Sequence, residues 1–166
     1  PMANVDAAAS WAQVDHADGR LHVWNDVIAA ELARLIASPP PDAARLKLFG
    51  RRKLGSMNSW MHNSRKLVRS DMPTLLMHPD DARERQIGDR QPVRIGTAAG
   101  SLEVTVEISD EVIQGSVSYP HGWGHSGGWQ HAAALPGVNI NLLASAEPAD
   151  WEQVSGNVLL DGIPVT

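Results

Sequence analysis

The stretch GRRKLGSMNSWMHN, residues 50–63, combines cations with small hydrogen-bonding side chains. Arg51, Arg52 and Lys53 precede a run of small, polar and soft side chains in which Trp60 is the only Phe, Tyr or Trp residue. This composition suits neither a strand nor a helix and predicts a loop. Cations followed by hydroxyl and amide groups indicate a segment that could bind an anion.

The positive charge of the chain is concentrated around this stretch. Eight of the fourteen Lys and Arg residues lie between Arg45 and Arg69 without an intervening Asp or Glu, although the net charge is −5. An anionic ligand or partner bound at one place would suit this distribution, and a solvated basic edge would give the same run. A polyanion or nucleic-acid binding module is an alternative, because Trp60 lies among the cations. The overall acidity argues against that alternative.

A second segment, HGWGHSGGWQH at residues 121–131, is rich in Gly, His and Trp. Its glycines would let backbone amides approach a ligand closely, and its tryptophans could form stacking walls. The residues concerned are Gly122, Gly124, Gly127, Gly128, Trp123 and Trp129. A zinc site is less favoured than packing or hydrogen-bonding histidines, because His121 and His125 lie in a glycine-rich loop without a carboxylate. No GxSxG motif marks a hydrolase nucleophile.

The third candidate is PGVNINLL, residues 136–143, in which Asn139 and Asn141 alternate with apolar residues. On one face of a strand, two amides could bind the donor and acceptor edges of a planar ring. A solvated edge strand would show the same alternation.

Composition limits the class of protein that could carry these segments. The 166 residues are 43% apolar, which is enough for one domain with a core. The absence of cysteine excludes disulfides, thiolate metal ligands, iron–sulfur ligands and a cysteine nucleophile within these residues. No apolar run reaches membrane length, and the Pro-Met start resembles neither a signal peptide nor a natural initiator. We expect a cytoplasmic protein whose N-terminus is truncated.

The elements that must position these segments are mostly strands. Residues 1–23 are expected to be irregular, and Asn25 should cap a helix that the prolines at 39–41 end. A strand at 46–49 should enter the 50–63 loop, and residues 92–109 alternate as a β-hairpin turning at 99–100. Further expected elements are a buried strand at 73–78, a helix at 79–86, a strand at 115–120 and a final edge strand at 162–166. These predict a mainly β fold with short helices, a β-barrel at 46–166 preceded by a connector at 1–45 with one helix.

Five segments occur in an order that resembles the C-terminal domain of the molybdopterin guanine dinucleotide oxidoreductases, which include formate dehydrogenases, nitrate reductases and dimethyl sulfoxide reductase. The resemblance covers residues 46–166. Its segments are NSWMHN, LLMHPDDARERQIGDRQPVRI, GSLEVTVEISDEVIQGSVSYPHGWGH, PGVNINLL and VSGNVLLDGIPV.

The resemblance implies a double-psi β-barrel that closes over bis(molybdopterin guanine dinucleotide), with Mo or W held mainly by the dithiolenes. It also implies that the loop GSMNSWMHN, residues 55–63, runs against the pterin and phosphates of the cofactor, and that Arg51 and Arg52 add long-range attraction to the pyrophosphate. Trp60 is then either a buried anchor of this loop or a stacking partner. The residues that the resemblance places at the cofactor are Arg51, Arg52, Ser56, Met57, Asn58, Ser59, His121, Gly122, Asn139 and Asn141.

The sequence also departs from the family. Many relatives have a cationic or aromatic residue near the cofactor at the position of Leu159, Leu160 and Asp161, so no contact is assigned there. The metal-bound residue and any cluster cysteines of the family lie outside these residues. The chain is therefore expected to have no metal ligand or catalytic residue, to be inactive alone, and to bind a cofactor whose chemistry is intrinsic. The expected partners are the N-terminal domains of the same polypeptide; a stand-alone barrel subunit docking on a separate catalytic chain is the alternative.

Overall fold

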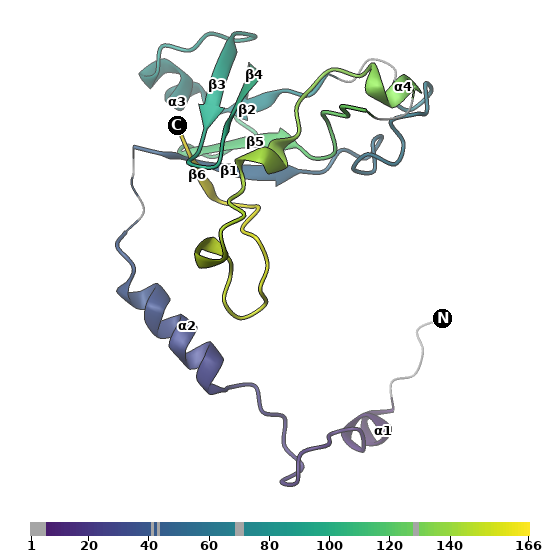
Figure 1. The fold of residues 1–166 in the computed structure, drawn as a ribbon, viewed down its shortest axis with the longest axis vertical. Helices are drawn as coiled ribbons and strands as arrows, with labels where there is room; N and C mark the ends of the chain where they lie inside the picture. Colours follow the sequence, from purple (N-terminus) through teal and green to yellow (C-terminus); the bar gives the residue numbers. More distant parts are fainter. Residues whose placement is uncertain (1–5, 41, 43, 69–71, 128–129) are drawn as a thin grey trace. The chain divides into compact units, whose positions relative to one another are not determined.

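The computed structural model describes residues 6–40, 42, 44–68, 72–127 and 130–166. The chain divides into two compact units, Pro1–Pro40 and Pro41–Thr166, and Figure 1 shows the elements of each. Among the described residues, no helix is long and apolar enough to span a membrane.

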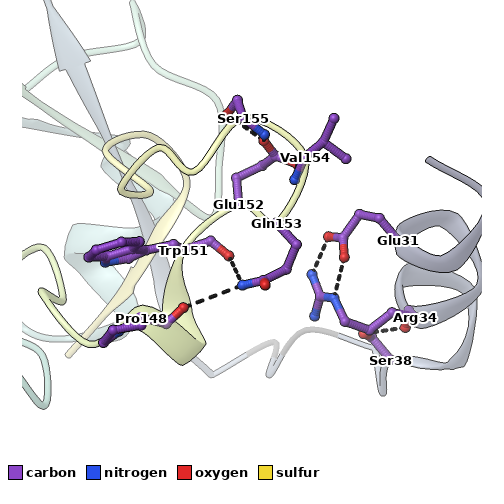
Figure 2. A network of polar contacts seen from close by, with 9 residues as sticks. All are labelled: Glu31, Arg34, Ser38, Pro148, Trp151, Glu152, Gln153, Val154 and Ser155. Carbon is purple, nitrogen blue, oxygen red and sulfur yellow. Dashed lines mark hydrogen bonds and ion pairs between the residues drawn. The ribbon is translucent and has the colours of Figure 1, made fainter. Parts of the chain in front are cut away.

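The first unit contains the helix that the sequence predicted. Helix α2 spans Asp26–Ala37, and the Asn25 side chain caps it by accepting a hydrogen bond from the Ile28 amide at 3.0 Å. Arg34 forms two hydrogen bonds with Glu31, of 2.6 and 2.7 Å, one turn apart on this helix (Figure 2).

The unit also contains a helix that the sequence reading missed. Helix α1 spans Ala7–Trp11, within the segment expected to be irregular, so the prediction of a single helix in the connector was wrong. Asp6 caps it by accepting hydrogen bonds from the amides of Ala8 and Ala9. Alanine has the highest helix propensity, and this cap supplies the start signal.

The second unit is built on a six-stranded sheet with the strand order β3-β4-β2-β5-β1-β6. Every predicted strand before residue 121 is confirmed, and so is the final edge strand; β1 extends two residues beyond its predicted end. The strands are β1 (Leu46–Arg51), β2 (Leu75–Met77), β3 (Pro92–Gly96), β4 (Ser101–Ile108), β5 (Ser116–Pro120) and β6 (Ile163–Val165).

The pairing of the strands mixes two directions. Strand β1 is parallel to β5, and β2 is parallel to β4, whereas the β1–β6, β2–β5 and β3–β4 pairs are antiparallel. The two outer strands are joined as well, because Gly96 and Thr166 exchange backbone hydrogen bonds of 2.9 and 3.1 Å. The sheet therefore curls until its outer strands meet at this one residue pair.

The interior of the curled sheet is aliphatic, with Tyr119 as the one aromatic residue of the described core cluster. Strand β5 is buried along its whole length, as expected for a strand in the middle of a sheet. In β4 the inward positions Val104 and Val106 are buried. On the predicted wet face Glu103 is exposed, whereas Thr105 and Glu107 are only partly exposed.

Short helices and turns cover the rest of this unit. Helix α3 (Pro79–Glu84) begins with proline and acids, as predicted. The others are α4 (Gln130–Ala133) and the 3₁₀ helices η1 (Ile140–Leu143) and η2 (Pro148–Asp150). After η2, the Gln153 side-chain amide donates to the carbonyls of Pro148 and Trp151, and the Glu152 carboxylate accepts from the amides of Val154 and Ser155 (Figure 2).

Candidate functional site

The two loops that the sequence singled out leave the sheet side by side. Strands β1 and β5 are parallel neighbours with Arg51 opposite Pro120, so both end at the same edge. The segment at 52–68 follows β1, and the segment at 121–127 follows β5. The His121 amide donates to the Arg51 carbonyl at 3.1 Å and extends this pairing into the loops. Loops at one edge of a rigid scaffold are a common location of binding sites.

Glycines allow these loops to touch. A Cβ atom at Gly50 would overlap the His121 imidazole, and one at Gly122 would overlap the carbonyl of Asn58. Gly122 also has a φ of +86°, a conformation that side chains disfavour. Both positions therefore require glycine, and together they bring the predicted residues Asn58, His121 and Gly122 to one place.

An open groove of about 500 Å³ lies along the 52–68 segment. In it, the Arg52 guanidinium donates to the Asn58 side-chain oxygen at 2.7 Å. The lining residues are Arg52, Lys53, Leu54, Met57 and Asn58. Three of them were predicted cofactor contacts; Lys53 and Leu54 were missed, although Lys53 belongs to the same run of cations.

The backbone of this groove is strained. Met57 and Asn58 have φ angles of 45° and 61°, in the left-handed region. Asparagine tolerates this region, but it is unfavourable for a long unbranched side chain such as that of Met57. The amides of Ser56 and Met57 both donate to the Lys53 carbonyl, which holds the turn in place. Strain of this kind is concentrated at functional sites in proteins.

Three of the predicted residues have structural partners in the chain. The Ser56 side chain is buried and donates to the Lys53 carbonyl at 3.1 Å. Ser59 is half-buried and its carbonyl accepts from the His62 amide. The Arg51 guanidinium donates to the carbonyls of Ser118 in β5 and of Thr74 just before β2, at 2.8 and 2.9 Å, and it does not line the groove.

Charged groups on both sides act on the His121 imidazole. Burial lowers the pKa of His121, the positive charge of Arg52 lowers it further, and Asp161 opposes these effects. Asp161 also accepts a hydrogen bond from the Gly50 amide at 2.8 Å. Asp161 therefore lies beside the predicted site. It is the acidic residue that the sequence analysis noted in place of a cationic or aromatic one.

The prediction that Asn139 and Asn141 share one strand face was wrong. Residues 140–143 form η1, and Asn139 caps it by accepting a hydrogen bond from the Asn141 amide at 3.1 Å. The alternation of apolar residues was misread, because in the 3₁₀ helix Ile140 and Leu143, three residues apart, are the buried pair.

Asn139 nevertheless lies beside the 121–127 segment. A Cβ atom at Gly124 would overlap the peptide between Val138 and Asn139. The Val138 amide in turn donates to the Tyr119 hydroxyl at 3.2 Å, which fixes the start of the segment. Asn139 and Asn141 are exposed there, and their roles toward a cofactor stay predictions.

Trp60 and Trp123 each depart from one role that was expected of them, and stacking by Trp60 stays a prediction. Trp60 is 81% exposed, so it is no buried anchor of its loop. Trp123 is only 3% exposed and packs against the buried His62 with 4.5 Å between ring centroids, so it forms no open stacking wall. The Lys53 ammonium lies 5.9 Å from the centroid of the Trp123 ring. Gly128 and Trp129 lie outside the described residues.

A histidine pair joins the 52–68 segment to the 121–127 segment. The Nδ1 atom of His62 and the Nε2 atom of His125 are 2.6 Å apart, and the rings are nearly perpendicular. Within the described ranges, no group of three or more His, Cys, Asp or Glu side chains could hold a metal ion. The contact between the two rings links the 52–68 segment to the 121–127 segment.

Comparison with known proteins identifies the family. Residues 46–157 match the family described as "Molydopterin dinucleotide binding domain". Biotin sulfoxide reductase of Cereibacter sphaeroides is 30% identical over 102 residues, which are 60% of this chain and 13% of that protein. The structure of acetylene hydratase from Pelobacter acetylenicus matches with a TM-score of 0.62 at 21% identity, covering 89% of this chain and 20% of that one. The chain thus spans a small part of the proteins it resembles, and it belongs to the family of molybdopterin dinucleotide-binding domains found in the molybdopterin oxidoreductases.

Proposed function

We propose that this chain binds and orients bis(molybdopterin guanine dinucleotide) in a larger oxidoreductase. The observation that carries the proposal is the groove lined by Arg52, Lys53 and Asn58. Gly122 packs against the Asn58 peptide. Two cations, an exposed amide and a strained turn suit a dinucleotide, which presents anionic phosphates and a planar base. The donor set of the groove therefore fits the cofactor that the family binds.

The residues of the groove have separable tasks. Arg52 and Lys53 would attract and hold the phosphates, and Arg52 would exchange its bond to Asn58 for one to phosphate. The Asn58 amide would then be free to donate or accept at the dinucleotide. When bound, the cofactor supplies the oxidation–reduction chemistry of Mo or W. The remaining tasks, namely binding, orienting and excluding water, belong to the protein.

For the finer fold class, we propose the double-psi β-barrel. Two features support it: the two parallel strand pairs, β1 with β5 and β2 with β4, and the hydrogen bonds between Gly96 and Thr166 that join the outer strands. In the same proposal residues 46–166 form the barrel domain, and 1–45 are a connector to the N-terminal domains. The cations of the segment are assigned to the cofactor; the polyanion alternative is not favoured by the family match.

The proposal is tested by removing one groove charge in the full-length protein. Arg52→Gln should lower molybdenum and pterin content per folded molecule by about tenfold, the equivalent of about 1.4 kcal/mol. Arg65→Gln is the matched control, because Arg65 belongs to the same basic segment but is exposed and does not line the groove.

The two variants are compared by metal analysis, pterin fluorescence and thermal unfolding. Equal cofactor content in the wild type, Arg52→Gln and Arg65→Gln would contradict the assignment of the groove. A loss shared by both variants would indicate a general charge effect instead of a site.

A further inference from the structure

A cavity lies in the second unit, away from the groove. Its volume is about 260 Å³, and its lining comes mainly from aliphatic core side chains, among them Leu46, Leu75, Met77, Val93 and Val117. Leu46 is the first residue of β1 and Val117 the second of β5, whereas the groove follows the last residues of these strands. The cavity therefore lies toward the opposite end of the barrel from the candidate cofactor site.

The size and the mainly aliphatic lining of the cavity suit the apolar part of a small ligand. An aliphatic cavity of about 150 Å³ is known to stay free of water and to bind benzene. A larger cavity with the same kind of lining has room for a chain of about six carbon atoms, while water would find few hydrogen-bond partners there.

Two arginines also line the cavity, Arg85 and Arg94. Among the described residues, the exposed Arg94 has no ion-pair partner within 4.0 Å. Arg85 donates to the Ala44 carbonyl at 3.2 Å, and its distances to the carboxylates of Glu84 and Asp81 are 3.5 and 3.8 Å. Charge-assisted hydrogen bonds to carboxylates are shorter, about 2.7–2.9 Å, so both guanidinium groups could donate to a better-placed carboxylate.

We propose that this cavity is a binding site for a small amphipathic carboxylate, with its apolar chain between the strands and its carboxylate at Arg94 and Arg85. The site is separate from the cofactor groove and does not depend on the proposed function. A cationic ligand is the competing possibility, because three acidic residues lie near these arginines: Glu84, Asp81 and Glu103. The test therefore includes a cationic probe.

Isothermal titration of the full-length protein with four probes tests the proposal. Hexanoate should bind with a Kd of about 1 mM or less. The other three probes are controls: acetate lacks the six-carbon chain, hexanol lacks the negative charge, and hexylammonium carries a positive charge instead. Each should bind at least about fivefold more weakly than hexanoate, since each loses one of the two contacts. Undetectable hexanoate binding, or equal binding of hexanol or hexylammonium, would overturn the proposal.

Variants then locate the bound probe. Arg94→Gln should weaken hexanoate binding about fivefold and leave hexanol binding unchanged. The control is Arg83→Gln, because Arg83 is an exposed arginine of α3 that does not line the cavity. Ile87→Phe should fill part of the cavity and weaken both hexanoate and hexanol. Arg94 is exposed, so its variant tests the proposal even if Ile87→Phe fails to fold. Equal effects of Arg94→Gln and Arg83→Gln would overturn it.

Discussion

At the scale of single residues, His121 and Gly122 connect the two loops of the candidate site. The His121 ring occupies the space that a side chain at Gly50 would need, and Gly122 allows the Asn58 peptide to approach. Each contact depends on the absence of a Cβ atom, at Gly50 in the first case and at Gly122 in the second. A single methyl group added at Gly50 or Gly122 should therefore change the geometry of the groove.

Replacing His121 should change how stability depends on pH. Burial and Arg52 lower the pKa of His121 in the folded protein, so the unfolded chain binds the proton more readily. The stabilising contribution is complete above the ordinary histidine pKa of about 6.5 and is lost as the pH falls through the lower folded-state pKa.

Urea unfolding at several pH values checks this expectation. His121→Gln should show a smaller loss of unfolding free energy between about pH 7.5 and pH 5 than the wild type. His16→Gln, a change in the first unit, serves as the control. The same pH dependence in the wild type and in His121→Gln would show that this imidazole does not contribute.

Substituting Gly122 should cost more than its backbone conformation alone explains. Gly127 has a nearly identical φ, 79° against 86°, but a Cβ atom there would meet nothing within 4 Å. Gly127→Ala should therefore cost only the strain of the left-handed conformation, about 1 kcal/mol. Gly122→Ala adds an overlap with the Asn58 carbonyl and should cost at least about 2 kcal/mol. Chemical denaturation of both variants measures the difference; equal losses would refute the close contact.

At the scale of elements, the short 3₁₀ helix η1 decides what Asn139 and Asn141 do. The Asn139 side chain caps the helix, whereas Asn141 contributes its backbone amide to that bond. The two residues are therefore not equivalent, as they would be on one face of a strand. The contact at Gly124 places their segment beside the 121–127 loop.

Alanine substitutions distinguish the two arrangements. Asn139→Ala should lower the free energy of unfolding by about 1 kcal/mol, because it removes a cap. Asn141→Ala should change it by no more than about 0.5 kcal/mol, as for an exposed surface residue. Thermal or urea unfolding measures both. Similar effects of the two substitutions would favour the strand arrangement that the sequence alone suggested.

At the scale of the whole molecule, the described chain supplies an open groove with donors and no metal-binding cluster. A groove open on one side holds a dinucleotide weakly, because much of the ligand surface stays in water. The relatives are far longer than this chain, which spans 13% and 20% of the two that were compared.

We therefore expect the 166 residues, purified alone, to fold but to retain no molybdenum. The core and the closed sheet should give a cooperative unfolding transition, while formate, nitrate and sulfoxide activities should be absent. Circular dichroism during heating, metal analysis and activity assays test the three parts. Stoichiometric metal in this chain would contradict the expectation, because it would show that the open groove retains the cofactor without the rest of the enzyme.

The sequence by itself determined the elements whose signals are local. Asn25 marked the start of α2, the alternation from Leu102 to Ile108 marked β4, and the acids after Pro79 marked α3; all three are present. Each signal depends on neighbours within a few residues, which is the range that propensity and periodicity report. The order of the motifs also identified the family, since it extends along much of the chain.

Only the tertiary structure decided which residues line the groove. Arg51 and Arg52 are adjacent in sequence, yet Arg51 bonds to strand carbonyls whereas Arg52 lines the groove, because β1 ends between them. The burial of Trp123 and the exposure of Trp60 likewise depend on how two distant loops meet. Such contacts join residues about sixty positions apart, as His62 and His125 are, so no local pattern could have predicted them.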